Sequence, residues 1–246
     1  MPNDCNNSFT ISPVTTNQWK ELTDSFQVRG EGYQQDFLKT YFPEPDYSVT
    51  PVARTYPEIR ANRAETEEEK ERLLKNEPTI RDDSWWDWRV QNWGTKWDVY
   101  SCLNDWDSEG PSEEFSASFC TAWSPMNERW MAEVSKQFPG ALLTNYYEET
   151  GLDFCGVTVA KDGVVRDLCT EWSSFMKEYA LKDTPDLDAL LEEEEQDLDE
   201  WFWENCDSGE YYDFVFECLQ KDIDQMIRQV MEQTSAPTMT ELVGQK

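Results

Sequence analysis

Apolar and polar residues alternate in five short stretches of the chain, a pattern typical of strands with one buried face. The stretches are residues 7–12, 96–105, 114–123, 142–147 and 154–159. Gly110-Pro111 separates the second stretch from the third, which predicts a β-hairpin. Lys161-Asp162-Gly163 predicts a turn after the last stretch.

Apolar residues at intervals of three and four predict helices between these strands. Thr15 or Thr16 caps the first helix, and Ser124-Pro125 starts the second. Their apolar faces consist of Trp19, Leu22 and Phe26 and of Trp130, Val134 and Phe138. The resulting order of strand, helix, strand, strand, helix and strand is that of the split βαβ, or ferredoxin-like, motif, with residues 154–159 extending the sheet.

Residues 43–83 interrupt this order. Four prolines between residues 43 and 57 favour an extended, irregular passage, and residues 59–76 are rich in helix-forming side chains. We interpret 43–83 as an insertion into an α+β domain of residues 1–181.

Helical periodicity continues from Val165 almost to the end of the chain, in apolar stripes that begin at Leu168, Leu187 and Tyr212. Breaks fall at Thr184-Pro185 and at residues 207–209. The pattern predicts three amphipathic helices. The last two are expected to form an acidic helical hairpin over residues 182–246 that packs on the first domain, with a frayed end after residue 235.

Tryptophan is concentrated between Trp85 and Trp130, where eight of the twelve lie. Side chains of this size dominate core energetics, so this density predicts the centre of the packed domain. The cluster at residues 85–93 could stack nucleic-acid bases, but the aspartates beside it favour core packing.

The charge of the chain excludes some partners. It has 51 acidic and 21 basic residues, a net charge of −30, which repels nucleic acid and anionic membranes and attracts basic protein surfaces. Residues 182–246 hold 19 acidic and 4 basic residues, so half of the net charge lies on about a quarter of the chain. We therefore expect neither direct nucleic-acid binding nor membrane binding.

The densest acidic run is Glu192 to Glu200, with seven carboxylates in nine residues. On a continuous helix, which rises about 1.5 Å per residue, that is one charge per roughly 2 Å. The axial charge spacing of duplex DNA is about 1.7 Å. The candidate partner-binding residues are Glu192, Glu193, Glu194, Glu195, Asp197, Asp199 and Glu200, with Trp201 or Trp203 as an anchor.

The residue types of the chain give little support for catalysis or for metal binding. The chain has no histidine to serve as a base or zinc ligand, and its seven cysteines include no Cys-x-x-Cys pair. We expect no enzyme activity and no cofactor. Residues 105–110 resemble the first half of a calcium loop, but Ser116 occupies the twelfth position, which favours a plain acidic hairpin tip.

The start lacks a secretory signal and no long apolar run is present, so we expect a cytoplasmic protein with free thiols.

Several short motifs resemble the ferredoxin-like domain of Api92-like proteins, which come from phages and plasmids. They are MPN-x-C-x-N at the start, NWGTKW at 92–97, TAWSP at 121–125, FP-G at 138–140, YYEETG at 146–151 and FCGV at 154–157. The similarity covers roughly residues 1–165, with Asp4 and Met126 departing from the pattern. It implies a ferredoxin-like fold and a mobile-element origin, and it carries over no catalytic residue.

These observations lead to one main hypothesis and several alternatives. The main hypothesis is an acidic protein in the host-cell cytoplasm that inhibits a host defence or DNA-processing protein by occupying its basic, nucleic-acid-binding groove. The main alternative is a non-catalytic structural or assembly module whose acidic surface only confers solubility. Adaptation to high salt is a further alternative, and a nucleotide-binding sponge is disfavoured by the scarcity of basic clusters. Exposed aromatic stripes leave a homodimer open.

Overall fold

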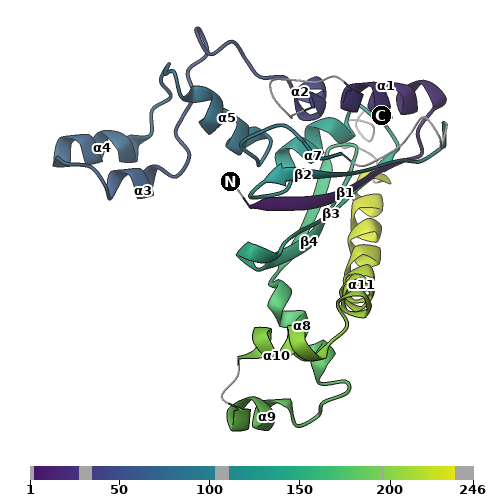
Figure 1. The fold of residues 1–246 in the computed structure, drawn as a ribbon. Helices are drawn as coiled ribbons and strands as arrows, with labels where there is room; N and C mark the ends of the chain where they lie inside the picture. Colours follow the sequence, from purple (N-terminus) through teal and green to yellow (C-terminus); the bar gives the residue numbers. More distant parts are fainter. Residues whose placement is uncertain (1–2, 28–34, 103–110, 195–196, 236–246) are drawn as a thin grey trace, which may run out of the picture.

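A five-stranded antiparallel sheet forms the centre of the computed structural model, which describes residues 3–27, 35–102, 111–194 and 197–235 (Figure 1). The strand order is β2-β1-β3-β4-β5. The strands are β1 (Asp4–Ser12), β2 (Phe115–Ala122), β3 (Leu142–Glu149), β4 (Phe154–Lys161) and β5 (Val164–Thr170). Helices cover the sheet, so the predicted α+β class is confirmed.

The strands β2 and β3 lie on either side of β1, and both are antiparallel to it. The helix α7 (Glu128–Ser135) connects them, which makes the split βαβ arrangement of the ferredoxin-like fold. In the described part of the strand predicted at 96–105, residues 96–102, one bridge joins Tyr100 to Cys120. Residues 103–110, which include the acidic tip at Asp105–Gly110, lie outside the described residues.

The prediction of a helix directly after Val165 is wrong. Residues 164–170 form β5, which pairs with β4 across the turn at Asp162 and Gly163, both in the left-handed region with φ of 48° and 85°. The helix α8 (Trp172–Ala180) begins only after this strand.

One face of the sheet is covered by α1 (Thr16–Gln27), α2 (Phe37–Tyr41) and α7. Thr15 caps α1 as predicted, because its Oγ1 accepts from the Gln18 backbone N–H while the Gln18 side chain accepts from Thr15 N–H. The predicted cap at Ser124 is wrong. Asn127 caps α7 by accepting from the Trp130 backbone N–H at 3.0 Å.

The tryptophan-rich stretch is only partly core. Trp93 and Trp130 are fully buried, but Trp123 is 39% exposed, and the other described tryptophans between residues 85 and 97 are half-buried. The reason is that three of them lie on α5 (Ser84–Asn92), a helix at the base of the insertion.

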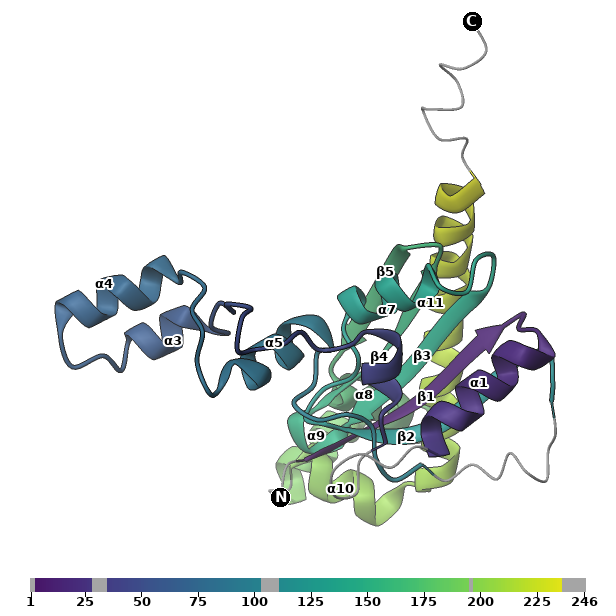
Figure 2. The ribbon, with the colours of Figure 1, turned by 90° about the horizontal axis from the view of Figure 1, so that it is seen from above.

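The insertion at residues 43–83 projects from the body as an arm, and Figure 2 shows it extending away from the sheet. Two short helices, α3 (Pro57–Ala61) and α4 (Glu67–Lys75), pack against each other in place of the one helix expected at 59–76. A bridge between Val52 and Thr79 closes the arm near its base.

The second face of the sheet is covered over β4 and β5 by α11 (Ser208–Ser235), together with α8. A single 3-10 turn, η1 (Thr150–Leu152), joins β3 to β4. The helices α9 (Leu187–Glu194) and α10 (Leu198–Asn205) lie beyond the end of the sheet, with α10 against α8 (Figure 1). Both α10 and α11 contact α8, and Phe202 of α10 packs on Tyr211 of α11 with 4.6 Å between ring centroids.

One apolar cluster joins Val157 and Val159 of β4 to Phe202 of α10 and to Leu219 and Ile223 of α11. The boundary expected after residue 181 therefore crosses a shared core. Within the described ranges, no helix combines the length and the apolar character that a membrane span needs.

Candidate functional site

The acidic run does not form one continuous helix. The helix α9 ends at Glu194, and Asp197 adopts extended backbone as the N-cap of α10, accepting from the Glu200 backbone N–H at 2.8 Å. An aspartate three residues before a glutamate is a strong helix start, so the chain begins a new helix here. The spacing of one charge per roughly 2 Å therefore does not apply.

The structure places the candidate carboxylates on two helices. Glu192 and Glu193 are exposed on α9, and Asp197 and Glu200 are exposed at the start of α10. Glu195 lies outside the described residues, as do the side chains of Glu194 and Asp199.

Trp201 and Trp203 have opposite environments. Trp201 is buried in the apolar cluster beneath α10, which makes it unsuitable as an anchor for a partner. Trp203 is 50% exposed and packs edge-on against Phe202, with 5.4 Å between ring centroids. Of the two predicted anchors, Trp203 is the one that a partner can reach.

The acidic layer, which we define as α9, α10 and α11, keeps its apolar side against the sheet and α8. Tyr211 is fully buried there, and its hydroxyl donates to the Trp172 carbonyl at 2.8 Å. Basic residues offset little of the charge on the outer side. Lys177 pairs with Asp188 at 2.7 Å, and Lys182 lies over the Phe214 ring at 3.7 Å from its centroid.

A second candidate site, which the sequence did not suggest, lies where α11 leaves the second face of the sheet uncovered. We call it the groove. Its floor consists of two rows of paired residues that run across the strands: Cys120, Asn6, Glu148 and Cys155 in one row, and Ser118, Ser8 and Tyr146 in the next. Its volume is about 470 Å³, within the range of ligand-binding pockets.

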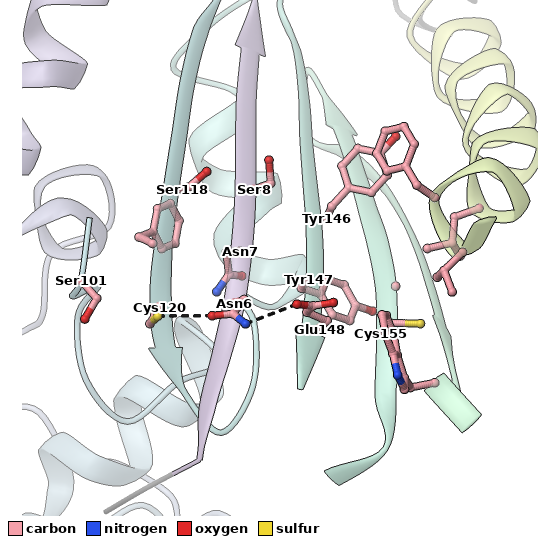
Figure 3. A pocket seen from close by; sticks show the side chains of 16 residues that line it. Asn6, Asn7, Ser8, Ser101, Ser118, Cys120, Tyr146, Tyr147, Glu148 and Cys155 are labelled. Atoms are coloured by element: carbon pink, nitrogen blue, oxygen red, sulfur yellow. Dashed lines mark hydrogen bonds between the residues drawn. The ribbon is translucent and has the colours of Figure 1, made fainter. Parts of the chain in front are cut away.

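Hydrogen bonds fix the first row of the floor (Figure 3). Asn6 accepts from the Cys120 thiol at 3.5 Å and donates from Nδ2 to Oε1 of Glu148 at 3.3 Å. The amide orientation is therefore set from both sides, which leaves the Glu148 carboxylate held in place at the centre of the sheet.

The wall of the groove is aromatic and apolar. Tyr146 stacks on Phe216 of α11 with 5.0 Å between ring centroids, and its hydroxyl lies 3.2 Å from the Gln220 side-chain oxygen. Phe216 is 52% exposed, although it carries a large apolar ring. Trp172 and Leu219 complete this side.

The groove does not resemble a nucleophilic active site. Burial raises the pKa of Cys155 to about 12 and raises the pKa of Cys120, so both thiols are protonated at neutral pH. Desolvation also raises the pKa of Glu148, opposed by the hydrogen bond from Asn6. Among the described residues, no group of three or more Cys, Asp or Glu side chains could hold a metal ion.

One sequence signal for the groove exists, and it lies in the alternation of β1 and β2. Both strands place large apolar residues on the covered face and only small polar ones on the other, such as Asn6, Ser8 and Ser118. The other wall comes from α11, more than two hundred residues after β1, so sequence patterns alone could not assemble the site.

The motifs NWGTKW and TAWSP lie against each other in space. Ser124 Oγ donates to the Gly94 carbonyl at 2.6 Å, and the Asn127 backbone N–H donates to the Trp93 carbonyl at 2.9 Å. Gly94, at a φ of 90°, brings its backbone so close to residues 125–127 that a side chain would collide with them. The two motifs therefore form one structural unit at the end of β2.

Comparison with known proteins locates the ferredoxin-like domain. Residues 96–190 match the family model described as the ferredoxin-like domain in Api92-like protein. This span begins later and ends later than the expected 1–165. Among solved structures, the chain is similar to the protein api92 from Yersinia pseudotuberculosis, with 11% identity, a TM-score of 0.36, and coverage of 70% of this chain and 98% of that one. No curated protein matches the chain. Residues 96–190 are therefore similar to the ferredoxin-like domain of Api92-like proteins.

Proposed function

We propose that this protein is a non-catalytic acidic inhibitor, carried by a phage or plasmid, that binds a host defence or DNA-processing protein in the host cytoplasm. The acidic layer occupies the partner's basic, nucleic-acid-binding groove and takes the place of phosphate groups. The carboxylates that act in this way come from α9, α10 and α11 together.

The observation that carries this proposal is the outward exposure of acidic side chains along all three helices. Glu192 and Glu193 on α9, Glu200 on α10, and Asp213 and Glu217 on α11 are all exposed. Since few basic residues lie near them, the negative potential of this layer extends into solvent and attracts a cationic surface. Trp203, half exposed beside Glu200, supplies an aromatic anchor of the kind that dominates protein interfaces.

A binding experiment with matched charge variants tests the proposal. The chain is immobilised, exposed to host-cell lysate freed of nucleic acid, and eluted with increasing NaCl. Captured nucleic-acid-binding proteins are then purified and titrated against the chain. We expect their affinity to fall steeply with salt and duplex DNA to compete for them, because both partners bind through the same charges.

The variant Glu192→Gln/Glu193→Gln/Glu200→Gln removes three charges from the acidic layer. Its control, Glu68→Gln/Glu71→Gln/Glu77→Gln, removes three exposed charges from the arm. The first variant should weaken binding and flatten its salt dependence, and the control should bind like the original chain. Equal loss in both variants, or in neither, would show that the acidic layer is not the binding surface.

A structural or assembly module is a second candidate function, and one observation favours it. On the open half of the second face, Asn6, Ser8 and Ser118 are exposed although they lie in the middle of strands. Deletion of the acidic layer cannot distinguish the two functions, because it also removes α11 and thereby exposes the apolar core on β4. If partner capture survives the charge variant on α9 and α10 but fails when Ser118→Trp blocks the open face, the module is the better description.

A further inference from the structure

The groove beside α11 carries one charged side chain and a flat aromatic wall, and this combination selects a class of ligand. Of the described residues that line it, only Glu148 is charged, and none is a lysine or an arginine. A phosphate or carboxylate compound would find no cationic partner there. Such a groove suits a neutral or positively charged molecule.

Negative charges just outside the lining of the groove also favour a positively charged ligand. Asp4 accepts a hydrogen bond of 2.6 Å from the Tyr100 hydroxyl and acts electrostatically on Cys120, at one end of the first row. Asp224 on α11 acts electrostatically on Tyr146, at the opposite wall. Carboxylates on both sides of the groove and one on its floor give it a negative potential, which raises the local concentration of cations.

The aromatic wall adds a second requirement, a flat body. The exposed ring of Phe216 extends the stack that it forms with Tyr146, and Trp172 closes the same side. Aromatic faces attract flat apolar groups by stacking and cations through the ring quadrupole. The small side chains of Ser8 and Ser118 leave the floor open for the ligand to approach the strands.

We propose that the groove is a binding site for a small organic cation, an amine or guanidinium group attached to a flat aromatic or apolar body. The positive group lies against the carboxylate of Glu148, with Asn6 holding that carboxylate in position. The flat body lies along Tyr146 and Phe216. This site is separate from the outer side of the acidic layer and does not depend on the inhibitor function.

Three probes with the same indole body test the choice of charge: tryptamine, which is positive, tryptophol, which is neutral, and indole-3-propionate, which is negative. Isothermal titration calorimetry with the full chain measures each affinity. We expect tryptamine to bind at least about tenfold more tightly than tryptophol, as expected for a hydrogen bond to a charged group. Indole-3-propionate should bind most weakly.

Variants distinguish a built site from the general attraction of an acidic protein. Glu148→Gln should abolish the preference for tryptamine and leave the tryptophol affinity unchanged. Glu68→Gln, which removes one exposed charge from the arm, should change neither. Ser118→Trp, at an exposed position in the middle of β2, should reduce binding of all three probes because it fills the floor.

Each remaining result contradicts the proposal. Equal affinity for tryptamine and tryptophol, equal effects of Glu148→Gln and Glu68→Gln, or no saturable tryptamine binding up to millimolar concentration would overturn it. Near-UV circular dichroism checks that the variants are folded. If Glu148→Gln does not fold, the probe series on the original chain and on Ser118→Trp still decides the question, and binding that persists in Ser118→Trp would place the ligand elsewhere.

Discussion

Arg81 and Asp87 form an ion pair at the base of the arm, with 2.5 Å between Nη2 and Oδ2 and the carboxylate of Asp87 fully buried. Arg60 contacts the other oxygen of Asp87 at 3.1 Å, and the Thr55 backbone N–H donates to that same oxygen. One carboxylate therefore joins α5 to both sides of the arm.

Removal of this carboxylate should destabilise the protein strongly. Asp87→Ala removes the buried carboxylate that Arg60 and Arg81 share, and breaking a buried pair costs about 3–5 kcal/mol. Asp83→Ala, which removes the more exposed partner of Arg54 and Arg81, should cost below about 1 kcal/mol. Chemical denaturation of both variants measures the two losses in the free energy of unfolding. Similar losses would mean that burial does not determine the strength of this network.

Asp98 should make stability depend on pH. Desolvation raises its pKa to about 7, against three backbone N–H donors from Leu38, Lys39 and Val99 that oppose the shift. An acid whose pKa is higher in the folded state favours folding while protonated. Its contribution is thus complete below about pH 4 and is lost as pH rises toward 7.

The variant Asp98→Asn removes this titration. Denaturant unfolding of the original chain and the variant should therefore show the variant becoming relatively more stable between pH 4 and pH 8. A stability difference that stays constant over this range would indicate that Asp98 titrates as it does in the unfolded chain.

Trp201 and Trp203, two residues apart on α10, should respond in opposite ways to truncation. Trp201→Ala empties a buried site and should cost about 3–5 kcal/mol of unfolding free energy. Trp203→Ala should have a small effect on stability and, under the proposed function, weaken partner binding. Thermal unfolding and the partner titration separate the two effects. Loss of binding in neither variant would remove Trp203 from the interface.

Alanine substitutions at Gly140 and Gly94 should distinguish the stability cost of backbone strain from that of a steric collision. Gly140 and Gly94 both have φ near +85°, but a Cβ at Gly140 would meet nothing within 4 Å, whereas at Gly94 it would lie 2.6 Å from the Asn127 backbone nitrogen. Gly140→Ala should cost about 1–2 kcal/mol, the penalty of the left-handed conformation. Gly94→Ala should cost about 1–3 kcal/mol more, from overpacking. Equal losses of unfolding free energy in the two variants would show that residues 125–127 move away from the new side chain without cost.

Sequence patterns predicted the sheet wherever burial alternates cleanly along a strand. In β1, Phe9 and Ile11 are fully buried between more exposed neighbours, so the period of two is visible in the residue types. In β5 no residue is fully buried, and Leu168 lies four positions before Trp172, a spacing that also fits a helix. In an edge strand of this kind, the alternation of apolar and polar residues is too weak to distinguish the strand from a helix.

The acidic run shows a different limit. Glutamate favours helix, so residues 192–200 suggest one uninterrupted helix from composition alone. The signal for the break was present, since Asp197 lies three residues before Glu200, whose backbone N–H it caps. Local hydrogen bonding by Asp197 outweighed the helical preference of its neighbours.

Because α4 buries none of its side chains and the arm extends away from the sheet in both views, chemistry performed there leaves the rest of the molecule unperturbed (Figures 1 and 2). A cysteine-reactive dye is less convenient in this chain, since it would also react with native thiols such as the exposed Cys169. An unnatural amino acid for bio-orthogonal labelling at Glu71, exposed on α4, would instead give a fluorescent reporter remote from both candidate sites. The arm thus offers a ready attachment point for single-molecule measurements of binding.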